Sequence, residues 1–410
     1  MPESHTPPRR SRLRHLGVVG ALVVGSLAQV VTPIVALLTL GARDFGEFSL
    51  VYLLYAWGLS VQLSVCSEPF TRGLVRARVR ADGADRYRSV STSLAAATAL
   101  VCGVTGALVW GGAVAGALGA LAAFASVVRA GDRYRRVVER GLAGPVAGDA
   151  VFLVVFATTA VLSAGSLSGV EGVLVPWAVA AVTTSAVASR PRLPRRGDLT
   201  SWRREHGAHI RPLLKESLVL DASSVGGAYL LVPLLSVTGF GIYRAVSNVA
   251  TPVRLVTEAL RPLASRPLGP RATQVFLVGL TAAGVLAGVA AWAALVAVDH
   301  YGWDLGVVVE LRDHAIGTAV FVGASLVGAM TYYRARVWAS PRQLWRGRLA
   351  QSGTALAMPL VGAWAGGLDG AIAGTAAATV LGALVWVLLK PQGQDGPSPG
   401  GATPRPTARS

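Results

Sequence analysis

Long apolar runs recur along the whole chain, and they constrain its fold more than any other feature. Most of the runs reach roughly 17 to 25 residues, the length at which a helix crosses about 30 Å of hydrocarbon. Only 14% of the 410 residues are charged, and the mean hydropathy is +0.52. A soluble domain carries about 25% charged residues, so this chain cannot cover a water-facing surface. Because a chain in hydrocarbon must satisfy its backbone polar groups internally, the runs predict an all-α polytopic membrane protein.

The runs predict twelve spans in two six-helix bundles. The first six are 16–40, 45–66, 91–110, 112–128, 146–162 and 173–188, and the second six are 218–237, 241–260, 274–298, 315–330, 349–365 and 371–389. The predicted organisation is a disordered N-terminus (1–15), a first bundle (16–189), a basic linker (190–215), a second bundle (216–390) and a disordered tail (391–410). The loops are too short for a folded soluble domain, so the protein acts within the bilayer.

Basic residues indicate the orientation of the chain in the membrane. Of the 38 Lys and Arg residues, 34 lie in the segments on the side of the N-terminus, and the other four are Arg43, Arg244, Arg254 and Arg312. Lys and Arg accumulate on the cytoplasmic side of membrane proteins, so both termini are predicted in the cytoplasm of a cell-membrane protein. The same rule explains the net charge of +17 without a nucleic-acid partner. Cys66 and Cys102 lie in apolar runs, which predicts no disulfide framework and no metal site.

A short motif occurs twice and relates the two groups of spans. DFGEFSLVYL begins at Asp44 and GFGIYRAVSN begins at Gly239, and they align with Phe45-Gly46 on Phe240-Gly241. Each copy follows one apolar run and opens the next, so each marks a helical hairpin turn on the outer side, where Gly allows a tight connection. Six spans per half give both halves the same orientation, which predicts parallel repeats about an axis along the membrane normal.

With this motif pair and span pattern, the chain resembles the polysaccharide-export flippases of the multidrug/oligosaccharidyl-lipid/polysaccharide exporter superfamily. The resemblance implies two six-helix bundles around a central cavity, alternating access, and outward movement of polyprenyl-pyrophosphate-linked sugars across the cytoplasmic membrane. It implies a polyprenyl-linked glycan, the lipid bilayer and glycan-assembly proteins as partners, with no cofactor and no enzymatic activity. The chain departs from some members because it has no added helix pair after the twelfth span.

Polar residues inside predicted spans are candidates for function, because they are expensive to bury in a membrane. In the span 241–260 they occupy one arc of about 120° on a helical projection. These residues are Arg244, Ser247, Asn248, Thr251, Arg254 and Glu258. The stripe is either the wall of a substrate cavity or a seam buried against a neighbouring helix and satisfied by interhelical hydrogen bonds.

Asp221 and Gln29 extend this candidate site. Reflection through the predicted hairpin at residues 238–239 places Asp221 level with Arg254 and Glu258, about two turns from the cytoplasmic face. Pairing of these charges is either a fixed strut or a site where a pyrophosphate competes for Arg254. Gln29 shares a face of the first span with Ser26 and Thr32, and Pro33 follows. Asp149 lies near the inner end of its span, a position that fits an interfacial residue.

Several functions fit these observations. The leading hypothesis is a flippase of lipid-linked oligosaccharides or polysaccharide precursors, and the alternative is a drug or cation antiporter of the same superfamily, whose cavity should be rich in acidic and aromatic residues. A membrane glycan polymerase or glycosyltransferase would need an acidic metal or sugar-nucleotide motif or a large outer loop, and the sequence contains neither. A membrane scaffold would lack a polar path between the halves.

The predicted topology can be tested by cysteine labelling. In a variant that lacks Cys66 and Cys102, a cysteine replacing Asp44 should react with a membrane-impermeant reagent in intact cells, because Asp44 is predicted outside. Labelling that requires permeabilised cells would contradict the orientation.

Overall fold

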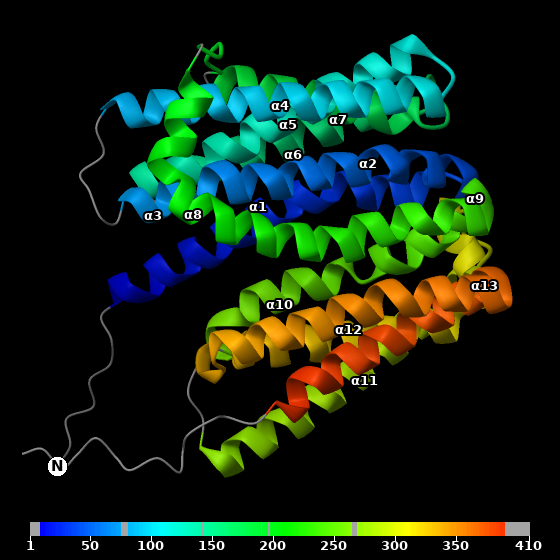
Figure 1. The fold of residues 1–410 in the computed structure, drawn as a ribbon. Helices are drawn as coiled ribbons and strands as arrows, with labels where there is room; N and C mark the ends of the chain where they lie inside the picture. The colour runs from blue at the N-terminus through cyan, green and yellow to red at the C-terminus, as the bar shows by residue number, and fades with distance from the viewer. Residues whose placement is uncertain are drawn as a thin grey trace, which may run out of the picture.

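The computed structural model describes residues 9–74, 81–140, 143–189, 191–195, 197–264 and 269–389, and these residues fold almost entirely into helices (Figure 1). The helices of the first part are α1 (Arg9–Thr39), α2 (Ala42–Gln62), α3 (Glu68–Leu74), α4 (Ala81–Val109), α5 (Ala113–Arg140), α6 (Ala143–Ser163) and α7 (Glu171–Ala188). Those of the second part are α8 (Asp198–Asp221), α9 (Gly227–Val249), α10 (Thr251–Ala264), α11 (Pro270–His300), α12 (Ala315–Trp338) and α13 (Pro341–Leu388). Two short π-helices, η1 (Leu63–Ser67) and η2 (Ala222–Gly226), continue α2 and α8, and a 3-10 helix, η3 (Gly306–His314), precedes α12.

The prediction of a multi-pass helical membrane protein is confirmed. Eight helical segments in the described part are long and apolar enough to cross a membrane, and two shorter apolar helices cover Val23–Thr39 and Glu171–Val187. Two of the eight segments, Asp198–Thr257 and Pro341–Leu388, are far longer than one crossing requires. Each of these two contains a break in its backbone.

The breaks fold each long segment into more than one rod. In α9, Ser236 has φ 61° and ψ 168°, and its hydroxyl accepts a hydrogen bond from the backbone N–H of Gly239 at 3.3 Å. The turn predicted at residues 238–239 therefore occurs at Ser236, where a serine can cap the helix that follows. In α13, Gly366 and Gly367 leave the helical conformation, and Gly367 has φ 58°. The break falls between the predicted spans 349–365 and 371–389.

Other predicted turns are also present. Helix α1 ends at Thr39 and α2 begins at Ala42, which confirms the hairpin turn in front of the first motif copy. Gly111 has φ 64° and separates α4 from α5, so the predicted boundary between 91–110 and 112–128 is confirmed. Many helices extend beyond the predicted spans at one end: α5 continues to Arg140, and α8 begins at Asp198, inside the predicted linker 190–215. These extensions are polar, so hydropathy alone does not detect them.

The helices pack in neighbouring sets along the chain. Helices α4, α5, α6 and α7 lie together at the top of Figure 1, and α10 to α13 lie together at the bottom. Direct contacts link α4 to α5, both α5 and α6 to α7, and α12 to α10, α11 and α13. Helices α1, α2 and α9 lie between the two sets, and α2 packs along α9.

The two copies of the Phe-Gly motif meet at this central contact. A methyl group added to Gly46 would overlap the carbonyl oxygen of Val237, and one added to Gly241 would overlap the carbonyl oxygen of Ala42 and lie 2.9 Å from the backbone nitrogen of Gly46. The backbones of α2 and α9 therefore touch where any side chain would separate them. The motif that predicted two hairpin turns also forms a close contact between the two parts of the chain.

The linker helix α8 is anchored on the first part of the chain. Trp202 is 1% exposed, and its indole N–H donates to the carbonyl oxygen of Val65, inside the π-helix η1, at 2.8 Å. Arg86 of α4 donates to Glu205 at 2.7 Å. A π-helix disrupts the regular backbone hydrogen bonds, and here a buried indole from a distant helix binds one of its carbonyl groups. Helix α8 thus begins on the first set of helices and leads into the second.

The glycine contact predicts a steric effect on stability. Gly241→Val should destabilise the protein by about 1 to 3 kcal/mol, because the new side chain forces α2 and α9 apart in a packed core. The thermal unfolding temperature of the detergent-solubilised protein measures this. Gly239→Ala is the matched control, since a methyl group there meets its nearest side-chain atoms at 3.5 and 3.6 Å, an ordinary contact. Equal unfolding temperatures for wild type and Gly241→Val would contradict the prediction.

Candidate functional site

The predicted polar stripe lies on two helices rather than one. Helix α9 ends at Val249, Ala250 has ψ 0°, and α10 begins at Thr251. Pro252 follows at once, and a proline disfavours the helical conformation of the residue before it and cannot donate a backbone hydrogen bond. Arg244 and Asn248 therefore belong to α9, whereas Thr251, Arg254 and Glu258 belong to α10.

Arg244 and Asn248 form the part of the stripe on α9. Both side chains are half-buried, and the Asn248 amide donates to the backbone carbonyl of Arg244 at 3.2 Å. Arg244 lies within electrostatic reach of the phenol groups of Tyr229 and Tyr243. The Tyr229 hydroxyl in turn donates to the carbonyl oxygen of Leu50 in α2 at 2.5 Å. Arg244 thus places a guanidinium beside the contact between α2 and α9.

Asp221 lies at the other end of that contact. Its carboxylate is close to the hydroxyl groups of Ser217 in α8 and Ser60 in α2. The side chains of Arg254 and Glu258 lie outside the described part of the structure, so their pairing with Asp221 stays a prediction. Helix α2 therefore runs along the α8–η2–α9 segment from Gly46 beside Val237 to Ser60 beside Asp221.

The other two predicted site residues have opposite environments. Gln29 is exposed on α1, whereas Thr251 is 5% exposed at the start of α10. Helix α1 contacts both α9 and α10, so the helices that carry the predicted residues are neighbours. The structure thus brings the helices of the site together and leaves Gln29 accessible.

Sequence reasoning missed a buried ionic cluster in the first part of the chain. Asp149 of α6 is 2% exposed and accepts hydrogen bonds from two arginines of α5, Arg129 at 3.0 Å and Arg133 at 2.9 Å. Arg129 also donates to the backbone carbonyl of Ala28 in α1 at 3.3 Å and lies 4.1 Å from the centre of the Phe152 ring. Asp149 is therefore the centre of a network linking α1, α5 and α6, and its position at the inner membrane interface stays a prediction.

A signal for this cluster was present in the sequence. Arg129 and Arg133 are four residues apart, so they share one face of a helix. Reflection of position 149 through the connection between α5 and α6 gives a position near 134, level with Arg133 and somewhat more than one turn from Arg129. The arginines were assigned to a cytoplasmic loop because the hydropathy of the run falls after Val128.

A second ionic group lies one turn further along α5. Asp132 accepts hydrogen bonds from Arg135 at 2.7 Å and from Arg136 at 2.7 Å, and Arg135 also donates to Glu139 at 2.5 Å. These partners are all on α5, so this group does not connect different helices. It provides a useful comparison for the network at Asp149.

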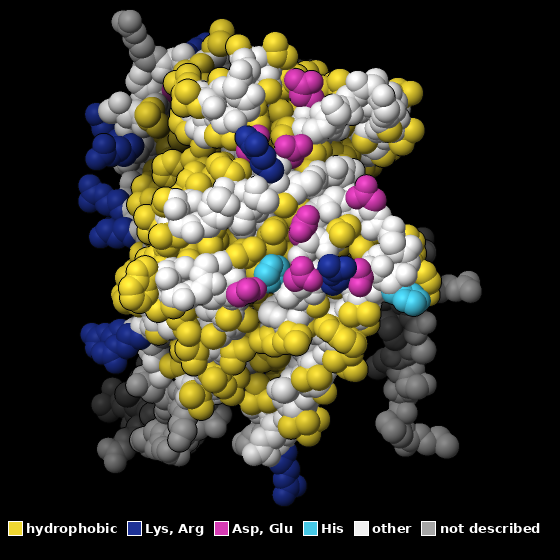
Figure 2. Space-filling view, turned by 90° about the vertical axis from the view of Figure 1, so that its right-hand side faces the viewer, with side chains coloured by type: hydrophobic (Ala, Val, Ile, Leu, Met, Phe, Trp, Pro, Cys, Tyr) yellow, Lys and Arg dark blue, Asp and Glu magenta, His cyan; other side chains and the backbone are white. Residues whose placement is uncertain are grey.

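The right-hand end of Figure 1 carries a mixed polar surface. Figure 2 faces this end and shows acidic, histidine and a few basic side chains among hydrophobic ones. Around η3, Arg312 binds Asp299 at 2.7 Å, and His314 binds Asp369 at 2.9 Å. These pairs tie η3 to the end of α11 and to the turn of α13.

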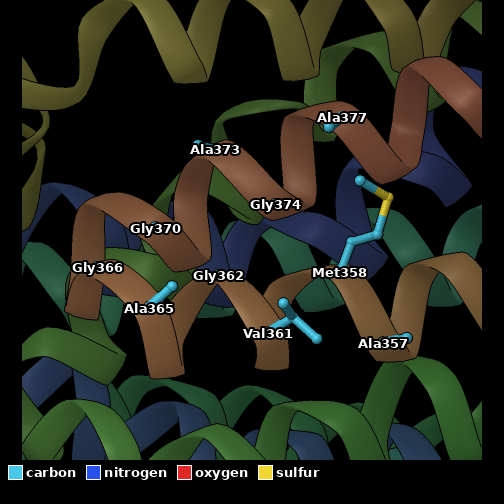
Figure 3. A pocket seen from close by; sticks show the side chains of 10 residues that line it. All are labelled: Ala357, Met358, Val361, Gly362, Ala365, Gly366, Gly370, Ala373, Gly374 and Ala377. Atoms are coloured by element: carbon cyan, nitrogen blue, oxygen red, sulfur yellow. The ribbon is translucent and has the colours of Figure 1, made fainter.

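A recess along α13 is apolar and separate from the charged residues. It is a groove of about 570 Å³ between the two arms of α13 (Figure 3). Its lining residues are Ala357, Met358, Val361, Gly362, Ala365, Gly366, Gly370, Ala373, Gly374 and Ala377. The arms cross closely, because a methyl group on Gly370 would overlap the carbonyl oxygen of Gly362. This groove follows from small-residue helix packing, and it supplies no group that could bind a charged substrate.

The arrangement of the helices is similar to that of solved transporter and flippase structures, so the resemblance is confirmed at the level of the fold. The lipid II flippase MurJ in an inward closed conformation has a TM-score of 0.62 with 9% identity, covering 89% of this chain and 87% of that one. An inward-facing multidrug resistance MATE family transporter of the MOP superfamily has a TM-score of 0.58 with 13% identity, covering 88% and 93%. A mutant form of the MATE transporter VcmN of Vibrio cholerae has a TM-score of 0.56 with 14% identity, covering 90% and 93%.

The similarity is one of structure rather than of sequence. No family profile matches the sequence, and no curated protein matches it. At 9 to 14% identity these solved structures establish the fold alone. The substrate has to be argued from the residues of this chain.

Proposed function

We propose that this protein is a flippase that moves a lipid-linked oligosaccharide or polysaccharide precursor across the cytoplasmic membrane by alternating access. The observation that carries the proposal is the position of Arg244, a half-buried guanidinium inside a membrane helix, beside the contact between α2 and α9. Guanidinium groups bind phosphate oxygens through two parallel hydrogen bonds, which suits a polyprenyl-pyrophosphate head group. The fold is shared with a lipid II flippase, which supports the same substrate class.

The charges along the candidate path favour an anionic substrate over a cationic drug. Arg244 lies on α9, and Arg254 is proposed to join it from α10, facing Asp221 and Glu258. The carboxylate of Asp149 is bound by two arginines, so it is neutralised within the protein. A cavity for cations needs acidic groups that are available to the substrate, and this carboxylate is already occupied.

The proposed architecture has twelve spans in two six-helix halves. The breaks at Ser236 and at Gly366 and Gly367 support it, because each divides a long helical segment into two rods. In this arrangement the halves are parallel repeats, both termini are cytoplasmic, and the contact at Gly46 and Gly241 lies on the outer side. Alternating access then requires the halves to separate at this contact while they close on the cytoplasmic side.

The proposed activity can be tested in cells. A deletion strain should accumulate a lipid-linked oligosaccharide on the inner leaflet of the cytoplasmic membrane, because its outward movement is blocked. Mass spectrometry of extracted lipids, combined with leaflet-specific labelling of the glycan, measures this accumulation. Complementation with the wild-type gene is the control. Changed drug sensitivity without any accumulated lipid-linked glycan would favour the antiporter.

The role proposed for Arg254 gives a second test. Arg254→Lys should lose much of the export while the protein remains folded, because an ammonium keeps the charge but not the two-pronged hydrogen bonding. Arg254→Ala should lose more export and also stability, since it leaves Asp221 and Glu258 without their proposed partner. Export of the glycan in the complemented deletion strain and size-exclusion chromatography in detergent measure the two effects.

A double variant separates substrate binding from a structural pair. Asp221→Asn combined with Arg254→Gln leaves neither residue charged, so stability should return while export stays lost. Full export by this double variant would remove Arg254 from the substrate contacts and identify the pair as a strut.

A further inference from the structure

The cluster around Asp149 holds α1 against the first part of the chain. Arg129 and Arg133 of α5 bind the two carboxylate oxygens of Asp149 at 3.0 and 2.9 Å, and Arg129 also reaches the Ala28 carbonyl of α1 at 3.3 Å. The approach of α1 is very close at Gly25. A methyl group there would overlap the Arg133 guanidinium and lie 3.1 Å from the Asp149 carboxylate.

The segment of α1 that Arg129 binds directly precedes an irregularity in the backbone hydrogen bonding of that helix. Pro33 lies inside α1, and a proline has no N–H to donate to the carbonyl of the residue four positions earlier, which is Gln29. Gln29 follows Ala28, the residue that Arg129 binds, and its side chain is exposed. Gln29 therefore combines an exposed side-chain amide with a backbone carbonyl that lacks its usual helical donor.

Burying these three charged groups costs free energy, which indicates that the cluster has a function besides stabilising the fold. A buried carboxylate with two guanidinium groups requires desolvation of three ions, and a well-packed apolar group at the same position is often equally stable. Helix α1 contacts α9 and α10, which carry Arg244 and the predicted site residue Arg254. A clamp on α1 therefore fixes the position of Gln29 relative to those helices.

We infer that Arg129, Arg133 and Asp149 are positioning residues that hold α1 so that Gln29 faces the substrate path. In this arrangement Gln29 presents its amide to the polar head group of the substrate, and the cluster does not contact the substrate itself. The inference deepens the proposed function and rests on it for the identity of the substrate. The orientation of Gln29 can be measured without transport.

The test uses the reactivity of a cysteine at position 29. In a full-length variant without Cys66 and Cys102, Gln29→Cys in inverted membrane vesicles should react with a membrane-impermeant methanethiosulfonate reagent applied to the cytoplasmic side. Adding Asp149→Asn should lower the labelling rate by about tenfold or more, because breaking a buried ion pair is costly enough to change the preferred position of α1. Gly25→Ala should lower the rate in the same direction, since it pushes α1 away while every charge is kept.

Arg135→Gln is the matched control. The Arg135 side chain is as little exposed as that of Arg129, but its partners Asp132 and Glu139 lie on its own helix. This variant should leave the labelling rate of position 29 unchanged. All rates are compared at equal amounts of folded protein, determined by size-exclusion chromatography in detergent.

The possible outcomes decide the inference independently of the transport assay. An unreactive cysteine at position 29 with the cluster intact, or wild-type rates in both Asp149→Asn and Gly25→Ala, would overturn it. So would an equal loss of labelling in Arg135→Gln. If position 29 responds as expected and the deletion strain accumulates no lipid-linked glycan, the positioning role stands and the proposed substrate is wrong.

Discussion

The contact between α2 and the α8–η2–α9 segment is the interaction on which the rest of the structure depends. It extends from Gly46 beside Val237, through the hydrogen bond between Tyr229 and the Leu50 carbonyl, to Ser60 beside Asp221. At the glycine end the two backbones touch, because lipid tails provide no hydrophobic force between helices and close packing must replace it. Every proposed movement of one half of the chain against the other has to begin or end at this contact.

The buried carboxylates of Asp149 and Asp132 are compensated by arginine partners, on a neighbouring helix in one case and on the same helix in the other. Asp149 is bound by two arginines from α5, and one of them also binds the backbone of α1. The group centred on Asp132 is satisfied within α5. The network at Asp149 therefore constrains the position of α1, whereas the group at Asp132 stabilises α5 alone. This difference is why the two clusters have different proposed consequences.

The linker helix α8 relates the two sets of helices in another way. Its beginning is held by Trp202 on η1 and by the pair of Arg86 and Glu205, and it continues through η2 into α9. From Asp198 onward, the continuous helical segment α8–η2–α9 therefore leads from the first set of helices to the second. Any relative motion of the halves has to bend this segment, and η2 and Pro212 provide places where its hydrogen bonding is already irregular.

The sequence by itself determined the membrane class and the approximate helix positions, because helix length and backbone satisfaction in hydrocarbon leave few alternatives. It also showed that the Phe-Gly motif occurs twice. It also indicated which polar residues belong to membrane helices, including Arg244, Asn248 and Asp221. Only the tertiary structure decided that Gly46 and Gly241 touch, that Asp149 lies under α1, and that the stripe of Arg244 divides before Thr251. These features depend on which helices are neighbours and on the exact register at a proline or a turn, and periodicity along one helix contains no information on either.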